Sequence, residues 1–333
     1  MDKITVSEAL KLENVVFVDT RTPKEFEECH IPGAFNVPIL SDEERHIVGY
    51  MYKQVSKDDA TSKAYIIFEK KKAEIIKQIT KIKNETKASK VIIYCWRGGM
   101  RSKVITQLMI DEGFNAVQLD GGHKQYRAYV REKLAVYSFK PKLIVLYGLT
   151  GTGKSELIRN VDLPKIDLED LAQHRSSLLG AVGLKPRGQK FFECLLFYEL
   201  EKLKDEKFVI IEGESRKVGD RIIPEFLFSA MKNNCVNVKV ISSIERRVKR
   251  IVPEYFDAED KCKQLKDIFG RMRQLLSNKV IDQLLAWMDS KEHEKVTEWF
   301  LLNYYDGKYA FTVDNVKYDY ELNNDGDGLS KLN

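Results

Sequence analysis

The sequence predicts an α/β protein with two parallel-sheet domains and a helical C-terminal part. Short β-branched runs at Val15–Val18 and Val91–Tyr94 are each followed by turn or helix signals. A further apolar run, Leu143–Tyr147, leads directly into a glycine-rich loop. From Ser243 to about Phe300 the pattern is helical, with Arg and Lys on its polar faces. Strands that alternate with helical segments are typical of parallel sheets covered by helices.

The helices expected in the first half follow the same alternation. The segments 25–29 and 103–112 have helical patterns, and the Lys-rich stretch 68–83 is the longest of them. Its apolar residues Ile75, Ile76, Ile79 and Ile82 share one face, which we expect to pack on the sheet. A short strand is expected at Ala116–Leu119, and another at Phe208–Ile211 in the second half.

The charged segment 126–142 has no strand pattern, so we place the domain boundary there. The expected organisation is a first domain over 1–128, a linker over 129–141, a second α/β domain with its helical part over 142–322, and a flexible tail rich in Gly, Asn and Asp over 323–333.

Bulk composition narrows the class of protein. The 333 residues are 43% hydrophobic, which is a normal globular share. No stretch reaches the roughly 18 apolar residues of a membrane helix, and the first 15 residues lack the apolar run of a signal peptide, so we expect a cytoplasmic protein. The net charge of +5 permits a nucleic-acid partner without requiring one. The five cysteines are odd in number and never form C-x-x-C, so they imply neither a disulfide framework nor a zinc site.

The residues GLTGTGKS at 148–155 match the P-loop pattern G-x-x-x-x-G-K-[ST] between a strand and a helix. In such a loop the glycines let backbone amides turn inward, the lysine adds a charge, and the hydroxyl can bind Mg²⁺. The candidate phosphate-binding residues are therefore Gly148, Thr150, Gly151, Thr152, Gly153, Lys154 and Ser155, with Ser155 as a candidate Mg²⁺ ligand. The motif does not identify the molecule that carries the phosphates.

Acidic and basic residues elsewhere in the second domain are candidates for the same pocket. Glu212 and Glu214 follow the strand at 208–211, where many P-loop proteins keep an acidic residue near the metal or its water. A solvated strand end is the alternative. The other pocket candidates are His174, Arg175, Ser215 and Arg216, for which exposed loop charges are the alternative.

Cys95 ends an apolar strand and opens the loop CWRGGMRS, ahead of a helix. The thiol is expected to face inward-pointing amides, a helix N-terminus and the arginines Arg97 and Arg101, all of which favour the thiolate. We therefore predict that Cys95 is a catalytic nucleophile supported by Arg97 and Arg101. The remaining cysteines are expected to be structural.

Upstream, VDTRTPKEFEECHIPGAFNVP places Asp19 and Arg21 at a strand end, before a tight turn. This segment resembles the rhodanese signature, in which such residues mainly fix the scaffold. A rhodanese-like domain with the CWRGGMRS loop, followed by a P-loop domain, resembles the tRNA 2-selenouridine synthase family over nearly the whole chain. Further matching segments are GGHKQYR at 121–127, DLEDLAQHRSS at 167–177, QKFFECLL at 189–196, EGESRKVG at 212–219 and LLNYYD at 301–306.

The resemblance implies a transferase that acts on 2-thiouridine at the wobble position of tRNA. Geranyl diphosphate would alkylate the sulfur, and selenophosphate, which its synthase could deliver, would then replace the S-geranyl group with selenium. The P-loop would hold the prenyl diphosphate, and Cys95 would bind selenium or assist its delivery. No tightly bound cofactor is expected, although Mg²⁺ could accompany the diphosphate.

The resemblance also requires surfaces for tRNA and for the geranyl chain. Candidate phosphate contacts for tRNA are Arg246, Arg247, Lys249, Arg250, Arg271 and Arg273, and a solvated helix face is the alternative. Candidates for an apolar slot are Phe191, Phe192, Leu195 and Leu196, which also fit an ordinary core.

Two other functions fit the same motifs. One is a P-loop kinase or ATPase with a regulatory rhodanese module. The other is a sulfurtransferase that passes persulfide sulfur to a protein partner.

Overall fold

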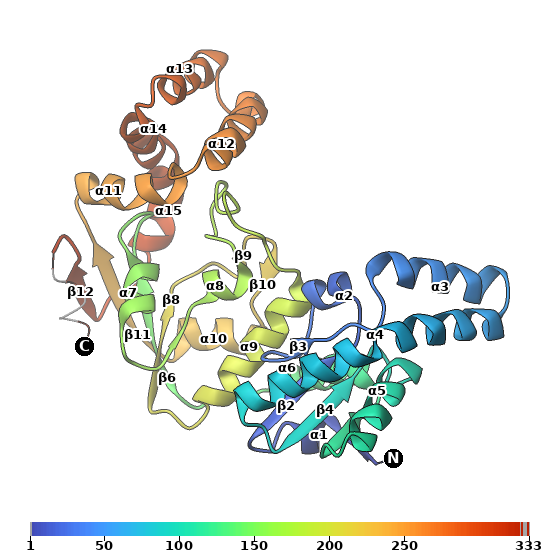
Figure 1. Cartoon of the computed structure of the whole chain (residues 1–333). Helices are drawn as coiled ribbons and strands as arrows, with labels where there is room; N and C mark the ends of the chain where they lie inside the picture. Colours follow the sequence, from blue (N-terminus) through green and yellow to red (C-terminus); the bar gives the residue numbers. More distant parts are fainter. Residues whose placement is uncertain (1, 327, 329–331, 333) are drawn as a thin grey trace. The chain divides into compact units, whose positions relative to one another are not determined.

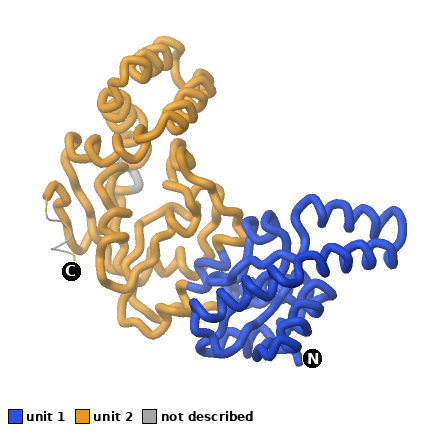
Figure 2. The backbone as a smooth tube through the Cα atoms, in the orientation of Figure 1, with its two compact units in different colours: residues 1–136, 193–198 blue, residues 137–192, 199–333 orange. Residues whose placement is uncertain are grey.

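A computed structural model describes residues 2–326, 328 and 332 of the chain. The chain forms two compact units, coloured separately in Figure 2. Unit 1 comprises Met1–Val136 and Glu193–Tyr198, and unit 2 comprises Tyr137–Phe192 and Glu199–Asn333. Each unit is built around a parallel sheet, which confirms the predicted α/β class. Among the described residues, no helix combines the length and apolar character that crossing a membrane requires.

The sheet of unit 1 has the strand order β1-β5-β4-β2-β3, and all neighbouring strands are parallel. Its strands are β1 (Lys3–Ile4), β2 (Val15–Asp19), β3 (Phe35–Asn36), β4 (Lys90–Tyr94) and β5 (Ala116–Leu119). Asp19 at the end of β2 lies opposite Tyr94 at the end of β4. The residues that follow these two strands, including Cys95, therefore meet at one edge of the sheet.

Helices surround this sheet, and two of them form a long hairpin (Figure 1). The helices are α1 (Val6–Ala9), α2 (Pro23–Glu28), α3 (Asp42–Gln54), α4 (Lys57–Thr86), α5 (Met100–Asp111) and α6 (Gly122–Ala135). The hairpin consists of α3 and α4, and α4 begins well before the predicted residue 68. Ser56 caps α4 by accepting hydrogen bonds from the backbone of Asp58 and Asp59, which fixes the earlier start.

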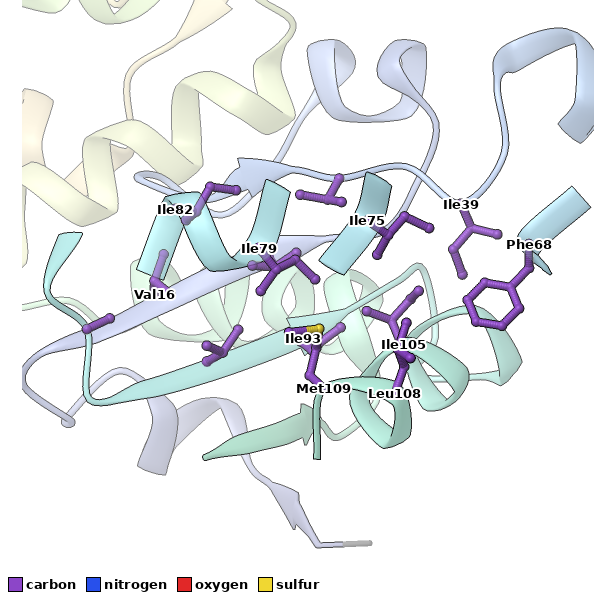
Figure 3. Packing of buried hydrophobic residues seen from close by; sticks show 14 of the residues in the cluster. Val16, Ile39, Phe68, Ile75, Ile79, Ile82, Ile93, Ile105, Leu108 and Met109 are labelled. Carbon is purple, nitrogen blue, oxygen red and sulfur yellow. The ribbon is translucent and has the colours of Figure 1, made fainter. Parts of the chain in front are cut away.

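The core of unit 1 lies between the sheet and helices α4 and α5 (Figure 3). Ile75, Ile79 and Ile82 of α4 are buried there, as the sequence predicted for that face. Ile76, expected on the same face, packs against the core but is only partly buried.

The sheet of unit 2 has the order β12-β11-β6-β8-β7, again with parallel neighbours. Its strands are β6 (Lys142–Tyr147), β7 (Lys165–Ile166), β8 (Phe208–Glu212), β11 (Cys235–Ile241) and β12 (Tyr320–Asn323), and a separate two-stranded ladder joins β9 (Lys217–Val218) to β10 (Arg221–Ile222). The glycine loop follows β6, so it lies at the carboxyl edge of the sheet, and because β6 is the middle strand the loop lies at the centre of that edge. Ligands bind at the carboxyl edge in open α/β sheets.

The helical C-terminal part is present as predicted. The helices of this unit are α7 (Lys154–Asn160), α8 (Leu168–Ala172), α9 (Gln189–Leu203, whose middle belongs to unit 1), α10 (Glu225–Asn233), α11 (Ile244–Tyr255), α12 (Glu259–Arg271), α13 (Asn278–Asp289), α14 (His293–Phe300) and α15 (Asp306–Asp314), with a 3-10 turn at Met272–Gln274 and a π-helical turn at Leu301–Tyr305. Helices α11 to α14 share an apolar core that includes Leu265, Phe269, Leu284 and Phe300.

Two expectations about connecting segments are corrected. The segment predicted as a linker begins inside α6, whose apolar residues Tyr126, Val130 and Leu134 are buried, so it is helical up to Ala135. The tail predicted to be flexible from residue 323 starts in a paired strand, because β12 runs parallel to β11. Residues 327, 329–331 and 333 of that tail lie outside the described residues.

Candidate active sites

The thiol of Cys95 lies directly after β4 and is buried. Its Sγ accepts hydrogen bonds from the backbone N–H of Gly99, at 3.3 Å, and from the hydroxyl of Ser102, at 3.2 Å. Helix α5 begins at Met100, so its N-terminus lies beside the sulfur. Two donors and the positive end of a helix stabilise negative charge on sulfur, which is the environment of a nucleophilic cysteine.

The N-terminus of α6 forms backbone hydrogen bonds to the cysteine loop. The backbone N–H groups of His123 and Lys124 donate to the carbonyl oxygens of Cys95 and Trp96, both at 2.9 Å. Gly122 has a φ of +57°, and a Cβ at this position would lie 2.3 Å from the Cys95 carbonyl oxygen. The GGHKQYR segment therefore needs glycine here so that the two loops can approach each other.

The two arginines of the cysteine loop differ in their surroundings. Arg97 is exposed. Arg101 instead forms an ion pair with Glu25 of α2, with a separation of 2.7 Å between Nη1 and Oε2. Burial opposes ionisation of Glu25, but the hydrogen bond from Arg101 keeps the pKa of this carboxyl below its usual value. Arg101 therefore positions α2 against the loop, and of the two arginines only Arg97 offers an open guanidinium to a phosphate.

Asp19 and Arg21 form the scaffold that the rhodanese signature implied. Both are buried, and the Arg21 guanidinium pairs with the Asp19 carboxylate at 2.6 Å while also donating to the Cys29 carbonyl oxygen at 2.7 Å. Cys29 and Cys194 are buried within unit 1, with their sulfur atoms 3.7 Å apart. Cys235 and Cys262 are only half-buried, so they are not the core cysteines that we expected.

The P-loop lies between the strand β6 and the helix α7, as its sequence predicted. Gly151 and Gly153 have φ values of +81° and +90°, a region that L side chains rarely adopt. The Lys154 ammonium folds back to donate to the carbonyl oxygen of Gly148 at 2.7 Å. The hydroxyl of Ser155 donates to a carboxylate oxygen of Glu169 at 2.8 Å.

Four carboxyl groups gather beside this loop, and all of them have raised pKa values. Burial is the main cause for Asp167, Glu169, Glu212 and Glu214, and repulsion from neighbouring carboxylates adds to it in the first three. The pKa of Glu169 rises to about 8. Glu212 is fully buried at the end of β8, where one carboxyl oxygen accepts from the Glu169 backbone N–H at 2.9 Å. The alternative of a solvated strand end is therefore wrong for Glu212.

A cavity of about 1020 Å³ opens at the P-loop. The predicted residues that line it are Gly148, Thr150, Gly151, Gly153, Lys154, Ser155, Arg175, Glu214, Ser215, Lys249 and Arg250. The other pocket candidates are Thr152, His174, Glu212 and Arg216, and none of them lines this cavity. Thr152 is buried and donates to the Leu149 carbonyl oxygen, whereas Arg216 is exposed and pairs with Glu225 at 2.8 Å. Burial, followed by the charge of Arg221, lowers the pKa of His174.

The helix α11 carries most of the basic residues predicted to contact tRNA, and one expectation here is corrected. Arg247 is buried: its Nε donates to the Thr150 carbonyl oxygen at 2.8 Å, and its Nη1 donates to Asp306 at 2.9 Å. It braces the P-loop and is not available to a tRNA phosphate. Arg250 is half-buried and also contacts the loop region, pairing with Glu156 at 3.1 Å.

The remaining basic candidates lie on the outside of unit 2. Arg246, Lys249 and Arg271 are exposed. Arg273 is exposed as well, and it pairs with Asp282 at 2.6 Å. Contact of these side chains with tRNA stays a prediction.

Sequence reasoning missed three residues that shape the phosphate site. Glu169 appeared only within the matching segment 167–177, but its carboxylate accepts a hydrogen bond from the Ser155 hydroxyl. Asp306 ends the LLNYYD segment and pairs with Arg247. The side-chain amide of Asn324, in the predicted tail, donates to the Thr152 carbonyl oxygen at 2.9 Å. No local pattern marks Asn324, because its partner is 172 residues away.

The Ser155 hydroxyl is an oxygen donor for Mg²⁺, an ion that commonly takes one or two protein ligands beside phosphate oxygens. Within the described part of the chain, no group of three or more His, Cys, Asp or Glu side chains is arranged to hold a metal ion. A metal at the P-loop would therefore depend on the phosphates of a bound ligand.

The fold and the two sites define a two-domain protein that joins a rhodanese-like domain with a buried thiol to a P-loop domain. Residues 4–129 match the family described as Rhodanese-like domain, and residues 141–275 match the family described as tRNA 2-selenouridine synthase AAA domain. The chain belongs to the tRNA 2-selenouridine synthase family, which confirms the resemblance inferred from its motifs.

Three relatives illustrate the extent of the similarity, and each of them is named tRNA 2-selenouridine synthase. The protein of Pseudomonas syringae pv. syringae is 30% identical, with 91% of this chain and 90% of that protein covered. The protein of Hydrogenovibrio crunogenus is 29% identical, with 92% and 91% covered. The protein of Nitrosomonas europaea is 34% identical over 74% of this chain, and the match spans 65% of the length of that relative.

Among solved structures, an N-terminal domain from Clostridium difficile 630 is 40% identical. It covers 39% of this chain and 98% of its own, with a TM-score of 0.37.

Proposed function

We propose that this protein converts 2-thiouridine at the wobble position of tRNA to 2-selenouridine in the cytoplasm, in two transfer steps. Membership of the tRNA 2-selenouridine synthase family supports the overall reaction. The observation that carries the proposal is that one chain holds two different reactive sites. One is a thiol that accepts two hydrogen bonds, and the other is a glycine loop whose lysine folds back onto the loop.

The first step is alkylation at the P-loop. The sulfur of 2-thiouridine attacks C1 of geranyl diphosphate, so that an S–C bond forms, the C–O bond breaks and diphosphate leaves with both bonding electrons. The base loses its N3 proton in the same step. The leaving diphosphate needs stabilisation of its charge, which the loop amides and Lys154 supply. Mg²⁺ held by Ser155 would neutralise further charge on the phosphates.

A nearby carboxylate is suited to accept the proton that the base loses. Glu169 hydrogen-bonds to Ser155 of the P-loop and has a pKa of about 8, which is close to neutral pH. A general base is most effective when its pKa lies near the pH at which it works. We assign this role to Glu169.

The second step is selenium transfer in unit 1. Selenium from selenophosphate forms a bond to C2 of the base, the bond from C2 to the geranylthio group breaks, and water cleaves the P–Se bond. Geranylthiol and phosphate are the other products. Cys95 assists this transfer, while the exposed Arg97 binds the phosphate oxygens of selenophosphate. The tRNA backbone is held in part by the exposed Arg246 and Lys249.

The test separates the two steps by supplying the substrates singly and together. The purified chain is incubated with 2-thiouridine tRNA, geranyl diphosphate and selenophosphate, and the nucleosides are analysed by mass spectrometry. Cys95→Ala should still produce geranylated tRNA but no selenouridine. Lys154→Ala should fail at geranylation and still convert tRNA that is already geranylated.

Other outcomes would contradict the proposal. Unchanged thiouridine in every mixture would reject it outright. ATP hydrolysis without affinity for tRNA would instead indicate a kinase or ATPase with a rhodanese module. Persulfide turnover at Cys95 without a tRNA product would indicate a sulfurtransferase.

A further inference from the structure

A cavity of about 740 Å³ lies beside the Cys95 loop, entirely within unit 1. Its volume is in the range of small-molecule binding pockets. Its lining comes from the segment before α3, from both helices of the α3–α4 hairpin, and from the loop and helix that follow Cys95. The lining residues include Tyr52 of α3, Ala64 of α4, and Cys95 and Arg97 of the cysteine loop.

The two hairpin helices each turn one face toward this cavity. On α3 the lining residues include Val48 and Tyr52, four positions apart, and on α4 they include Ala60, Ala64 and Phe68, also four apart. Residues at this spacing share a helix face. The small side chains of Ala60 and Ala64 leave space between the helices and the cysteine loop, so the cavity follows directly from the sequence of the hairpin.

Large apolar side chains around the cavity are open to solvent. The exposed fractions are 53% for Tyr52, 56% for Tyr65 and 61% for Met100. Single exposed apolar residues are common on protein surfaces, but these three line one hollow that ends at a buried thiol. A contiguous exposed apolar surface in a concave site is typical of a binding site for an apolar group.

The polarity of the cavity changes toward Cys95. The Cys95 thiol, which accepts two hydrogen bonds, and the exposed Arg97 lie at one part of the lining. Most side chains that the hairpin contributes are apolar, and its two basic side chains in the lining are Arg45 and Lys53. A ligand that matches this distribution has a polar, reactive end at Cys95 and an apolar chain along the hairpin. In unit 2, by comparison, the apolar cavity within the helical part has a volume of only about 40 Å³.

The apolar slot that the sequence suggested on α9 is not an alternative site for an apolar chain. Phe192 and Leu196 of α9 are completely buried, and Phe191 is nearly so, which makes them part of the protein core. None of these residues lines the cavity beside the cysteine. In unit 1, the open apolar space next to the Cys95 thiol is therefore the hairpin cavity.

We propose that the hairpin cavity binds the geranyl chain of S-geranylated uridine and thereby places C2 of the base beside Cys95. This inference rests on the proposed function and adds that unit 1 selects its substrate by the length of the S-alkyl chain. Each methylene that enters the cavity is removed from water, so binding strengthens as the chain grows.

The test measures selenation by the full-length protein on anticodon stem-loops that already carry an S-alkyl group. The substrates carry S-methyl, S-dimethylallyl or S-geranyl 2-thiouridine, and selenophosphate is in excess. For the wild-type protein, kcat/KM should rise by about tenfold or more at each step of this series, since discrimination of a single methylene is already worth about tenfold or more in an apolar pocket.

Matched variants localise the effect. Ala64→Phe fills the cavity and should lower kcat/KM for the S-geranyl substrate by about tenfold or more, with little change for S-methyl. Ser62→Phe adds the same ring to an exposed position of α4 outside the cavity, and it should behave as wild type. Geranylation of 2-thiouridine, which the proposed function assigns to unit 2, should be unaffected in both variants.

The outcomes separate this inference from the proposed function. If the wild-type protein selenates none of the S-alkyl substrates, the proposed function fails, and this inference fails with it. If it selenates all three equally well, or if Ala64→Phe keeps the wild-type chain-length preference, the cavity is not the geranyl site, although the proposed function stands. Even if Ala64→Phe folds poorly, the wild-type series can still reject the inference, because equal rates for the three substrates would show that the chain length is not recognised.

Discussion

Replacing Arg247 with alanine tests whether this side chain braces the P-loop or contacts tRNA. Arg247 is only 5% exposed, and its guanidinium joins three elements: α11 itself, the P-loop carbonyl of Thr150, and Asp306 at the start of α15. The substitution leaves the Asp306 carboxylate and the Thr150 carbonyl without these partners. Both the stability of unit 2 and the shape of the P-loop should therefore change.

The expected magnitude follows from the burial of the pair. Removing one partner of a buried ion pair costs about 3–5 kcal/mol, because the other charge stays buried without compensation. The side chain of Asp306 is 23% exposed in the structure, so water can partly solvate the carboxylate that remains in the variant. We therefore expect a loss near the lower end, about 3 kcal/mol in the free energy of unfolding of unit 2.

The assay is urea unfolding followed by tryptophan fluorescence in a Trp96→Phe background. Trp287 and Trp299, the two tryptophans that then remain, both lie in unit 2. Calorimetric titration with inorganic diphosphate reports on the P-loop in the same variants, and Arg247→Ala should bind it more weakly. Arg247→Lys keeps the charge but loses the planar fork, so its stability should be intermediate.

Arg246→Ala is the matched control, since Arg246 is the neighbouring residue on α11 and is exposed. A surface substitution of this kind should change the unfolding free energy by no more than about 0.5 kcal/mol. If Arg247→Ala unfolds at the same urea concentration as Arg246→Ala, while both weaken tRNA binding equally, the bracing role is refuted.

Two further substitutions test the carboxyl cluster and the cysteine loop. Burial, together with the charge of Glu214, raises the pKa of Glu169 to about 8, so the folded chain keeps a proton here that the unfolded chain releases above about pH 4.5. The contribution of Glu169 to the free energy of unfolding is therefore fully present below that pH and falls as the pH rises toward 8. Glu169→Gln should make the free energy of unfolding, measured in urea from pH 5 to 8, fall less steeply with pH. A pH slope equal to that of the wild-type protein would contradict the raised pKa of Glu169. Gly122→Ala places a Cβ against the Cys95 carbonyl oxygen and should destabilise unit 1 by about 2 kcal/mol or more and slow alkylation of Cys95 by iodoacetamide. Gly113→Ala, with a φ of +80° and nothing within 4 Å, is the control for backbone strain alone, and equal effects of the two alanines would show that the contact with the cysteine loop is unimportant.

Much of the fold was predictable because its signals are local. The strands β2, β4, β5, β6 and β8 lie within one residue of the predicted apolar runs. The hairpin helix α3 was missed, although Ser41 and Glu44 form a capping box at its start. The strands β11 and β12 were missed as well. β12 is a short edge strand that is defined only by its pairing with β11.

The partners of the charged residues were less predictable. A basic run such as Arg246–Arg250 has the composition of a surface that binds nucleic acid, and composition does not show which of its members faces inward. One signal was nevertheless present: Arg247 lies four residues before Ile251 and eight before Tyr255, on the stripe of α11 that packs inward. The ion pair between Arg247 and Asp306 could be identified only from the folded structure, because the two residues lie far apart in the sequence.

The sequence by itself determined the Cys95 loop and the P-loop, because residues 95–102 and 148–155 each contain their hydrogen-bond donors, glycines and candidate functional side chains within eight consecutive positions. Hydrogen bonds within each loop, such as that from Gly99 to Cys95 and that from Lys154 to Gly148, depend on local backbone geometry. Only the tertiary structure decided what surrounds these loops. The brace from Asn324 to Thr152 joins residues far apart in the chain, and the apolar cavity at Cys95 exists because the α3–α4 hairpin packs beside that loop. Side chains brought together by packing leave no pattern in the order of residues, since their distance along the chain is unrelated to their distance in space.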